Sequence, residues 1–151
     1  MRIGILGAGG IAATMAETIR PLEGVESYAV AARDLERARA FAEKWGFERA
    51  YGSYEEMLAD DQVDLVYIAV PHSHHHRWTM AALEEGRNVL CEKAFAANTE
   101  QAREMIRLAE SKKLLLTEAI WTRYMPSRQM IREIIDSGDI GEVMTVSSNL
   151  G

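Results

Sequence analysis

The sequence carries one glycine-rich string whose spacing suits a dinucleotide. Gly7-Ala8-Gly9-Gly10-Ile11-Ala12 fits the pattern G-x-G-x-x-A and directly follows a short apolar run. In this pattern the first glycine permits a tight turn, the second lets backbone approach a pyrophosphate, and the small last residue keeps a helix close to a strand. The first amides of that helix then face the phosphates. We therefore predict dinucleotide binding rather than a purely structural glycine turn.

Residues around position 33 indicate which dinucleotide the chain binds, NAD or NADP. An acidic side chain about 20 residues after the fingerprint would accept the ribose hydroxyls of NAD. That count reaches Ala32, and the next residue, Arg33, offers a planar guanidinium that suits the 2′-phosphate of NADP. Asp34 is the rival ribose partner, but its place before Leu35-Glu36-Arg37 is typical of a helix N-cap. The sequence favours NADP over NAD, and Arg33 disfavours a methyl-donor-binding domain.

Four histidines lie within five residues, from His72 to His76. Neutral imidazole is a common metal ligand, but no Cys or carboxylate completes an obvious set, so we predict no metal site. The preceding apolar run ends at Pro71, and loops at the carboxyl edge of parallel strands bind ligands. We therefore expect Ala69, Pro71, His72 and His75 to line a cofactor or substrate cleft, with Ser73 as the helix cap. A packing or surface role stays open for each histidine.

Glu92 and Lys93 follow the next apolar run, which places them at the same edge of the sheet. A lysine beside a hydride acceptor can donate a hydrogen bond to a substrate oxygen and help to move its proton. The alternative is a surface ion pair that contributes little. The position of both residues directly after a strand favours a place in the cleft over a surface ion pair.

The elements that must position these residues alternate between short apolar runs and stretches with helical period. Ile11, Met15 and Ile19 share one helical face, and the segments 38–45 and 102–109 repeat in the same way. Asn98 and Gln101 have the spacing of a capping box. This alternation predicts an α/β fold, a doubly wound parallel Rossmann sheet. The expected strands are 3–6, 27–32, 49–51, 64–70, 88–91 and 114–117.

Composition excludes several classes of protein. The chain has 151 residues, and its 17 basic against 23 acidic side chains give a net charge of −6, which argues against nucleic acid as a partner. No apolar stretch approaches the length of about 18 residues that a spanning helix needs. The N-terminus has the charged-then-apolar order of a signal peptide, but its glycine density suits that poorly. With the lone Cys91, this predicts a cytoplasmic protein without a membrane partner.

Five separated strings together resemble the Gfo/Idh/MocA oxidoreductase family, and within it the dimeric dihydrodiol dehydrogenase and xylose dehydrogenase-like branch. They cover nearly the whole chain in order. The strings are Gly7–Ala12, AVAARD at 29–34, YIAVP at 67–71 with His75, VLCEK at 89–93, and EAIWTRYMP at 118–126.

The resemblance implies a nicotinamide-dependent dehydrogenase that acts on a sugar, polyol or diol and forms a homo-oligomer. Lys93 matches the family's catalytic lysine, Glu92 would lie with it at the nicotinamide end, and Trp121 and Arg123 match a segment near the cofactor. Two residues depart from the family pattern: His72 replaces an Asn, and Ala94 replaces a Pro that commonly follows a cis bond. Because a cis bond before Ala94 would cost about 2.5–4 kcal/mol, we expect Lys93–Ala94 to be trans.

The resemblance also implies a second, α+β domain that this length cannot hold. We expect residues 1–125 to form the dinucleotide-binding domain and 126–151 a connecting helix with the first strand, 142–150, of the missing domain. An unpaired strand would expose an edge, which favours a fragment that is inactive alone. The competing hypothesis is a non-enzymatic dinucleotide sensor, which would have no use for a lysine in the cleft.

Overall fold

The computed structural model describes residues 1–149, and the chain divides into two compact units after Ala119. The first unit is a parallel sheet with helices on both faces. Over residues 120–149, the second contains one short 3-10 turn and one helix. The predicted domain boundary between residues 125 and 126 stays a prediction.

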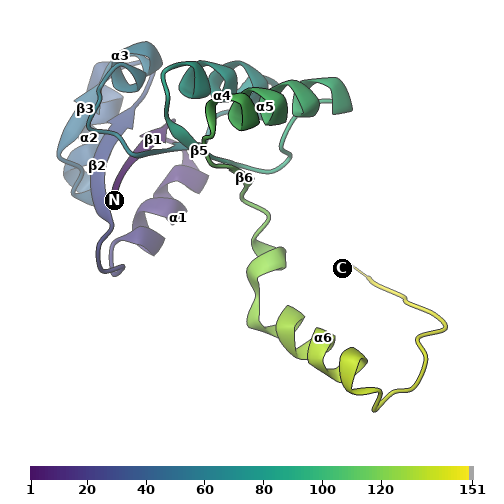
Figure 1. Ribbon diagram of the computed structural model, residues 1–151. Helices are drawn as coiled ribbons and strands as arrows, with labels where there is room; N and C mark the ends of the chain where they lie inside the picture. The colour runs from purple at the N-terminus through teal and green to yellow at the C-terminus, as the bar shows by residue number, and fades with distance from the viewer. Residues whose placement is uncertain (150–151) are drawn as a thin grey trace. The chain divides into compact units, whose positions relative to one another are not determined.

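The sheet of the first unit has six strands in the order β3-β2-β1-β4-β5-β6, and all neighbouring pairs are parallel (Figure 1). Chain order reverses between β1 and β4, which is the switch point where doubly wound sheets bind ligands. The structure thus confirms the predicted fold and each of the six strands to within a few residues at their ends. The strands are β1 (Arg2–Leu6), β2 (Glu26–Ala31), β3 (Arg49–Tyr51), β4 (Leu65–Ile68), β5 (Asn88–Cys91) and β6 (Leu116–Glu118).

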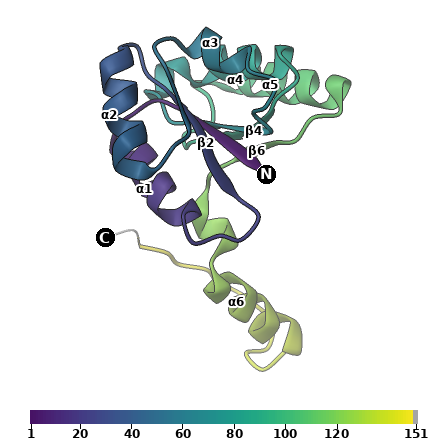
Figure 2. The same ribbon diagram turned by 90° about the vertical axis from the view of Figure 1, so that its left-hand side faces the viewer.

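Helices cover both faces of this sheet (Figure 2). Helices α1 and α2 pack on one face, where Ala12, Ala16 and Phe41 belong to one core; helices α3, α4 and α5 pack on the other, where Trp78 and Met57 belong to a second core. Their bounds are α1 (Gly10–Ile19), α2 (Leu35–Trp45), α3 (Tyr54–Leu58), α4 (His75–Glu84) and α5 (Thr99–Lys112), with a 3-10 turn, η1 (His72–His74), before α4.

Neighbouring side chains along each central strand enter different cores. Ile5 and Tyr67 face the α1/α2 core, whereas Leu6 and Ile68 face the other. All four are almost completely buried, because helices cover both faces of the sheet. The central strands therefore need apolar side chains on both faces. This burial fixes the register of the strands. The register in turn fixes where the carboxyl ends of neighbouring strands lie relative to one another.

Side-chain caps set where the helices begin. The Asp34 carboxylate accepts from the amide of Arg37 (2.9 Å), as predicted, and Asn98 accepts from the amide of Gln101 (2.9 Å). The prediction that Ser73 caps a helix is wrong. Residues His72–His74 already form a 3-10 turn behind Pro71, so Ser73 lies inside a helical turn instead of in the extended conformation of an N-cap.

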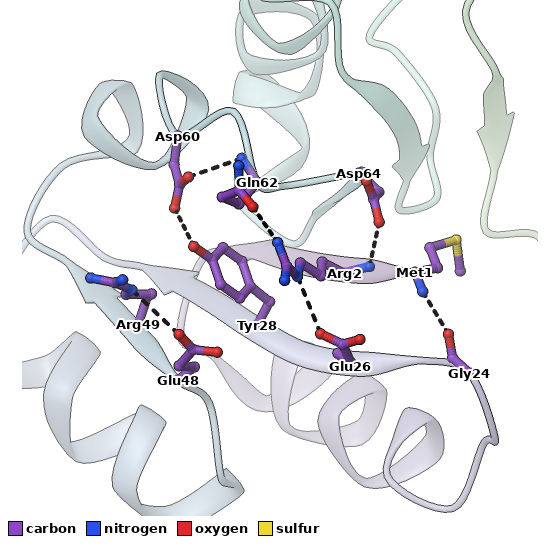
Figure 3. Close-up of polar contacts among 10 residues, drawn as sticks. All are labelled: Met1, Arg2, Gly24, Glu26, Tyr28, Glu48, Arg49, Asp60, Gln62 and Asp64. Atoms are coloured by element: carbon purple, nitrogen blue, oxygen red, sulfur yellow. Dashed lines mark hydrogen bonds and ion pairs between the residues drawn. The ribbon is translucent and has the colours of Figure 1, made fainter.

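A polar network joins the amino ends of β1 and β2 to the segment before β4 (Figure 3). The Arg2 side chain donates to Glu26 (3.2 Å) and to Gln62, and the Arg2 amide donates to Asp64 (2.7 Å). These contacts hold the sheet edge opposite to the carboxyl ends of the strands.

In the second unit, the turn η2 (Trp121–Tyr124) precedes helix α6 (Pro126–Ser137). The predicted strand over 142–150 is wrong for residues 142–149, which make no strand pairing, because a strand forms only when a neighbour accepts its backbone hydrogen bonds. Leu150 lies outside the described residues. Among residues 1–149, we find no helix with the length and apolar character needed to cross a bilayer.

Candidate cofactor site

A cleft of about 890 Å³ opens at the carboxyl ends of β1, β2 and β4. Ligand pockets usually have volumes of about 300–1,000 Å³, so this cleft can take a large ligand. Six predicted site residues line it: Gly7, Ala8, Gly9, Arg33, Ala69 and Pro71. The other lining residues are Ala32, Asp34, Arg37, Gly52, Ser53, Tyr54, Glu55, Val70, His74, Arg77 and Trp78.

Gly7 forms the tight turn that brings β1 against the end of β4. Its φ of +114° is unfavourable for other residues, and a Cβ added here would lie 2.5 Å from the carbonyl oxygen of Ala69. The Gly7 amide donates to Ala31 O (2.9 Å), and the Ala69 amide donates to Leu6 O (2.9 Å). These bonds connect the ends of β1, β2 and β4 at the base of the cleft.

Gly9 and Gly10 leave open space above the start of α1. Apart from the adjoining residues and the backbone of α1 itself, no atom lies within 4 Å of a Cβ added at either position, although the φ of Gly9, −102°, would accept a side chain. The first amides of α1 have no partner inside the helix, and Ala12 behind them is fully buried against the sheet. This open cradle of amides fits a pyrophosphate. Ile11, the next residue of the fingerprint, is largely exposed on α1.

Three arginines line the cleft, of which the sequence interpretation identified only Arg33. The Arg37 guanidinium donates to Ala8 O (3.0 Å), so it spans from α2 to the glycine turn. The Asp34 carboxylate is engaged at the helix cap. Arg33 and Arg37 are four residues apart across a helix start, which places both near the end of β2, and this spacing could have revealed Arg37.

An aromatic pair and the third arginine form another wall. Tyr54 and Trp78 meet edge to face with their ring centroids 4.8 Å apart, and the Arg77 guanidinium lies 4.5 Å from the Trp78 centroid. Burial raises the pKa of the Tyr54 phenol. The Arg77–Glu55 ion pair (3.7 Å) is exposed, so it adds little stability. These residues come from helices α3 and α4, and their meeting depends on tertiary packing.

The histidine cluster divides among different surroundings. His74 lines the cleft, whereas His72 and His75 do not. His75 is fully buried, and His72 packs edge to face against it with ring centroids 5.3 Å apart. His76 bonds to Glu104 (2.7 Å). Among residues 1–149, no group of three or more His, Cys, Asp or Glu side chains is placed to hold a metal ion.

Glu92 and Lys93 follow β5 at the same edge of the sheet, beside the residues that line the cleft and not among them. Glu92 is buried; one carboxylate oxygen accepts from the Tyr67 hydroxyl (2.5 Å) and the other from the Lys93 amide (3.0 Å). The Lys93 side chain is exposed. Glu92 therefore bonds to a buried phenol and to backbone, which differs from the surface ion pair considered above.

The bond between Lys93 and Ala94 is cis, so the expected trans bond is wrong. The residue type after the bond is local information, whereas contacts from other elements hold this backbone. Ala94 O lies 2.8 Å from a ring nitrogen of His75 on α4, and the Phe95 amide donates to Glu118 on β6 (3.0 Å). These contacts connect the backbone on the carboxyl side of Lys93 to elements distant in the chain.

Trp121 and Arg123 belong to the turn η2 in the second unit, where Trp121 is exposed. Their predicted place beside the cofactor stays a prediction.

Strand order, a glycine turn with an open cradle of amides, and arginines at the end of β2 define a dinucleotide-binding Rossmann domain. The chain belongs to the Gfo/Idh/MocA oxidoreductase family with an NAD-binding Rossmann fold, whose family model matches residues 1–120. This confirms the resemblance found in the sequence.

Relatives with named activities match nearly the whole chain. It is 44% identical to a D-xylose 1-dehydrogenase (NADP(+)) of Hypocrea jecorina, over 99% of this chain and 41% of the relative. It is 40% identical to a trans-1,2-dihydrobenzene-1,2-diol dehydrogenase of Mus musculus, over 100% of this chain and 46% of the relative. The crystal structure of a 3-ketoreductase from Actinomadura kijaniata with NADP matches with a TM-score of 0.87 and 31% identity, over 94% of this chain and 45% of the other. The chain thus spans less than half the length of these relatives.

Proposed function

We propose that the chain is the NADP-binding part of an oxidoreductase that transfers a hydride between nicotinamide and a hydroxyl-bearing carbon of a sugar, polyol or diol. The observation that carries this proposal is the arrangement at the end of β2. Two arginines, Arg33 and Arg37, line the same cleft as the glycine turn, while the neighbouring Asp34 carboxylate is held at a helix cap.

At the phosphate end, the chain binds by amides and guanidinium groups. The open backbone at Gly9 and Gly10 would accept the pyrophosphate, and Arg33 would pair with the 2′-phosphate through its planar fork. Arg37 is tied to Ala8 O and so holds the glycine turn beside that anion.

At the nicotinamide end of the cofactor, we assign transfer of the substrate's hydroxyl proton to Lys93. When bound, the nicotinamide donates or accepts a hydride. Lys93 Nζ would hydrogen-bond the substrate oxygen and take up or return its proton, while Glu92, anchored by Tyr67, fixes the backbone on the amino side of Lys93. The Lys93 residue is exposed, so its side chain is accessible to a substrate.

The substrate class rests on the relatives, two of which act on D-xylose and on a dihydrodiol. Both substrates carry adjacent hydroxyl groups on a small carbon skeleton. A sugar, polyol or diol is therefore the class that we test.

Calorimetric titration of this chain with NADP⁺ and NAD⁺ tests the cofactor assignment. We expect tighter binding of NADP⁺, and Arg33→Ala should remove about tenfold or more of that preference, since hydrogen bonds to charged groups contribute about 1.5–3 kcal/mol. Arg39→Ala is the control, because Arg39 lies on α2, the helix that follows Arg33, pairs with Glu36 and does not line the cleft. An unchanged preference in Arg33→Ala would remove Arg33 from the proposal.

Turnover by the protein expressed from its complete gene separates an enzyme from a sensor. With NADP⁺ and D-xylose or a dihydrodiol, we expect NADPH to form, and Lys93→Ala to reduce kcat by about 10²–10⁴-fold, the usual contribution of a general acid or base. Lys44→Ala is the control, because Lys44 lies over the Trp45 ring on helix α2. NADP⁺ binding without NADPH formation would favour the sensor, and NADPH formation that Lys93→Ala leaves unchanged would indicate a different proton carrier.

A further inference from the structure

We propose that His75 is a positioning residue, which holds the turn Glu92–Lys93–Ala94 against the end of β4. The imidazole is fully buried. Its Nδ1 lies 2.8 Å from Ala94 O and its Nε2 lies 2.9 Å from Val70 O. The inference rests on the proposed function, because the place of this turn matters for chemistry only if Lys93 works there.

The two carbonyl groups belong to loops that follow adjacent strands. Val70 comes after β4 and lines the cleft, and Ala94 comes after β5. Both partners are carbonyl oxygens, which only accept, so the ring joins the two loops when Nδ1 and Nε2 each carry a proton and each N–H donates to one carbonyl. A buried carbonyl that loses its donor costs about 1–3 kcal/mol, so removing the ring would release the two loops from each other.

Lys93 is consequently held on both sides. On its amino side, Glu92 is fixed by the Tyr67 hydroxyl, and on its carboxyl side, Ala94 is fixed by His75. The backbone of Lys93 is thus clamped while its side chain remains exposed. His76 offers a matched comparison, since its ring bonds to Glu104 and to neither loop.

Amide hydrogen exchange in this chain tests the clamp directly. His75→Gln keeps a polar side chain but cannot span both carbonyls. We expect exchange of the Lys93 and Phe95 amides to rise about tenfold, equivalent to the loss of about one hydrogen bond, with the Ile5 amide unchanged. His76→Gln should leave all three unchanged. Unaltered exchange at Lys93 and Phe95 in His75→Gln would overturn the proposal.

Binding of two probes tests the consequence for the cofactor. Against NADP⁺, His75→Gln should lose about tenfold in affinity, and against 2′,5′-ADP, which lacks the nicotinamide end, less than about twofold. Equal losses for the two probes would make His75 a general support of the cleft and overturn the inference. If the unaltered chain binds neither probe, the proposed function fails, while the exchange measurement still decides the clamp.

A measurement on the unaltered chain covers the case in which His75→Gln does not fold. A long-range ¹H–¹⁵N spectrum shows which ring nitrogens of His75 carry protons. Protons on both nitrogens support simultaneous donation to Ala94 O and Val70 O, and a ring nitrogen without a proton overturns the clamp.

Discussion

The Tyr67 hydroxyl donates to the Glu92 carboxylate at 2.5 Å, and this bond joins the centre of β4 to the residue before Lys93. Tyr67 is almost completely buried. Burial raises the pKa of its phenol above the ordinary value, and the neighbouring Glu92 raises it further. The phenol therefore keeps its proton and remains a donor at physiological pH.

Tyr67→Phe should destabilise the chain by about 1.5–3 kcal/mol, because it removes a hydrogen bond to a buried carboxylate. Urea unfolding at neutral pH measures this change. A loss below about 0.5 kcal/mol would mean that Glu92 has another partner of equal quality once the phenol is gone.

Gly7→Ala should destabilise the chain more than Gly24→Ala. Both glycines have positive φ (+114° and +77°), but a Cβ at Gly7 meets Ala69 O at 2.5 Å, whereas a Cβ at Gly24 has open space. Strain of backbone alone costs about 1–3 kcal/mol, and the clash at Gly7 adds to it. Thermal unfolding of the two variants compares them; equal losses would show that the close approach of β1 to β4 relaxes freely.

Gly9→Ala should leave the fold intact and weaken cofactor binding. A methyl group there meets no protein atom within 4 Å and the φ of −102° suits alanine, so the loss of stability should not exceed about 1 kcal/mol, the scale of an N-cap change. The methyl group would occupy the space assigned to the pyrophosphate. Titration with NADP⁺ should show at least about tenfold weaker binding; unchanged affinity would place the pyrophosphate elsewhere.

Asp60 should make stability depend on pH at the acidic end. Burial acts to raise the pKa of this carboxyl, but hydrogen bonds from Tyr51 (2.6 Å), the Gln62 amide and Tyr28 (2.9 Å) outweigh burial and lower the pKa from 3.8. Figure 3 shows the bonds from Tyr28 and Gln62 to Asp60. Because the folded pKa lies below the unfolded one, this stabilisation is present above pH 3.8 and is lost as the pH falls through the folded pKa.

Asp60→Asn provides the comparison for that pH dependence. The stability difference between the parent and Asp60→Asn, from urea unfolding, should be largest near neutral pH and shrink toward about pH 3. A difference that does not change with pH would show that the two phenols bind the neutral and the charged side chain equally well.

The fold and about a third of the residues that line the cleft could be predicted from local sequence signals. Buried parallel strands require continuous apolar runs, and a tight turn below a pyrophosphate requires Gly7, so these features are visible as residue types at fixed spacing. The position of Arg33 follows from the length of one strand–helix–strand unit. The caps at Asp34 and Asn98 are contacts over three residues, which is why their side chains also disclose them.

The sequence alone determined the Rossmann sheet, the phosphate turn and the class of cofactor, because each depends on residues close together in the chain. Tertiary packing decided the other features of the site. Only the packed structure decided that Arg37 and Arg77 share one cleft, that His75 faces two carbonyls while His74 lines the cleft, and that Lys93–Ala94 is cis. Each of these depends on contacts between elements distant in the chain, and residue types at short spacing carry no information about which distant elements meet.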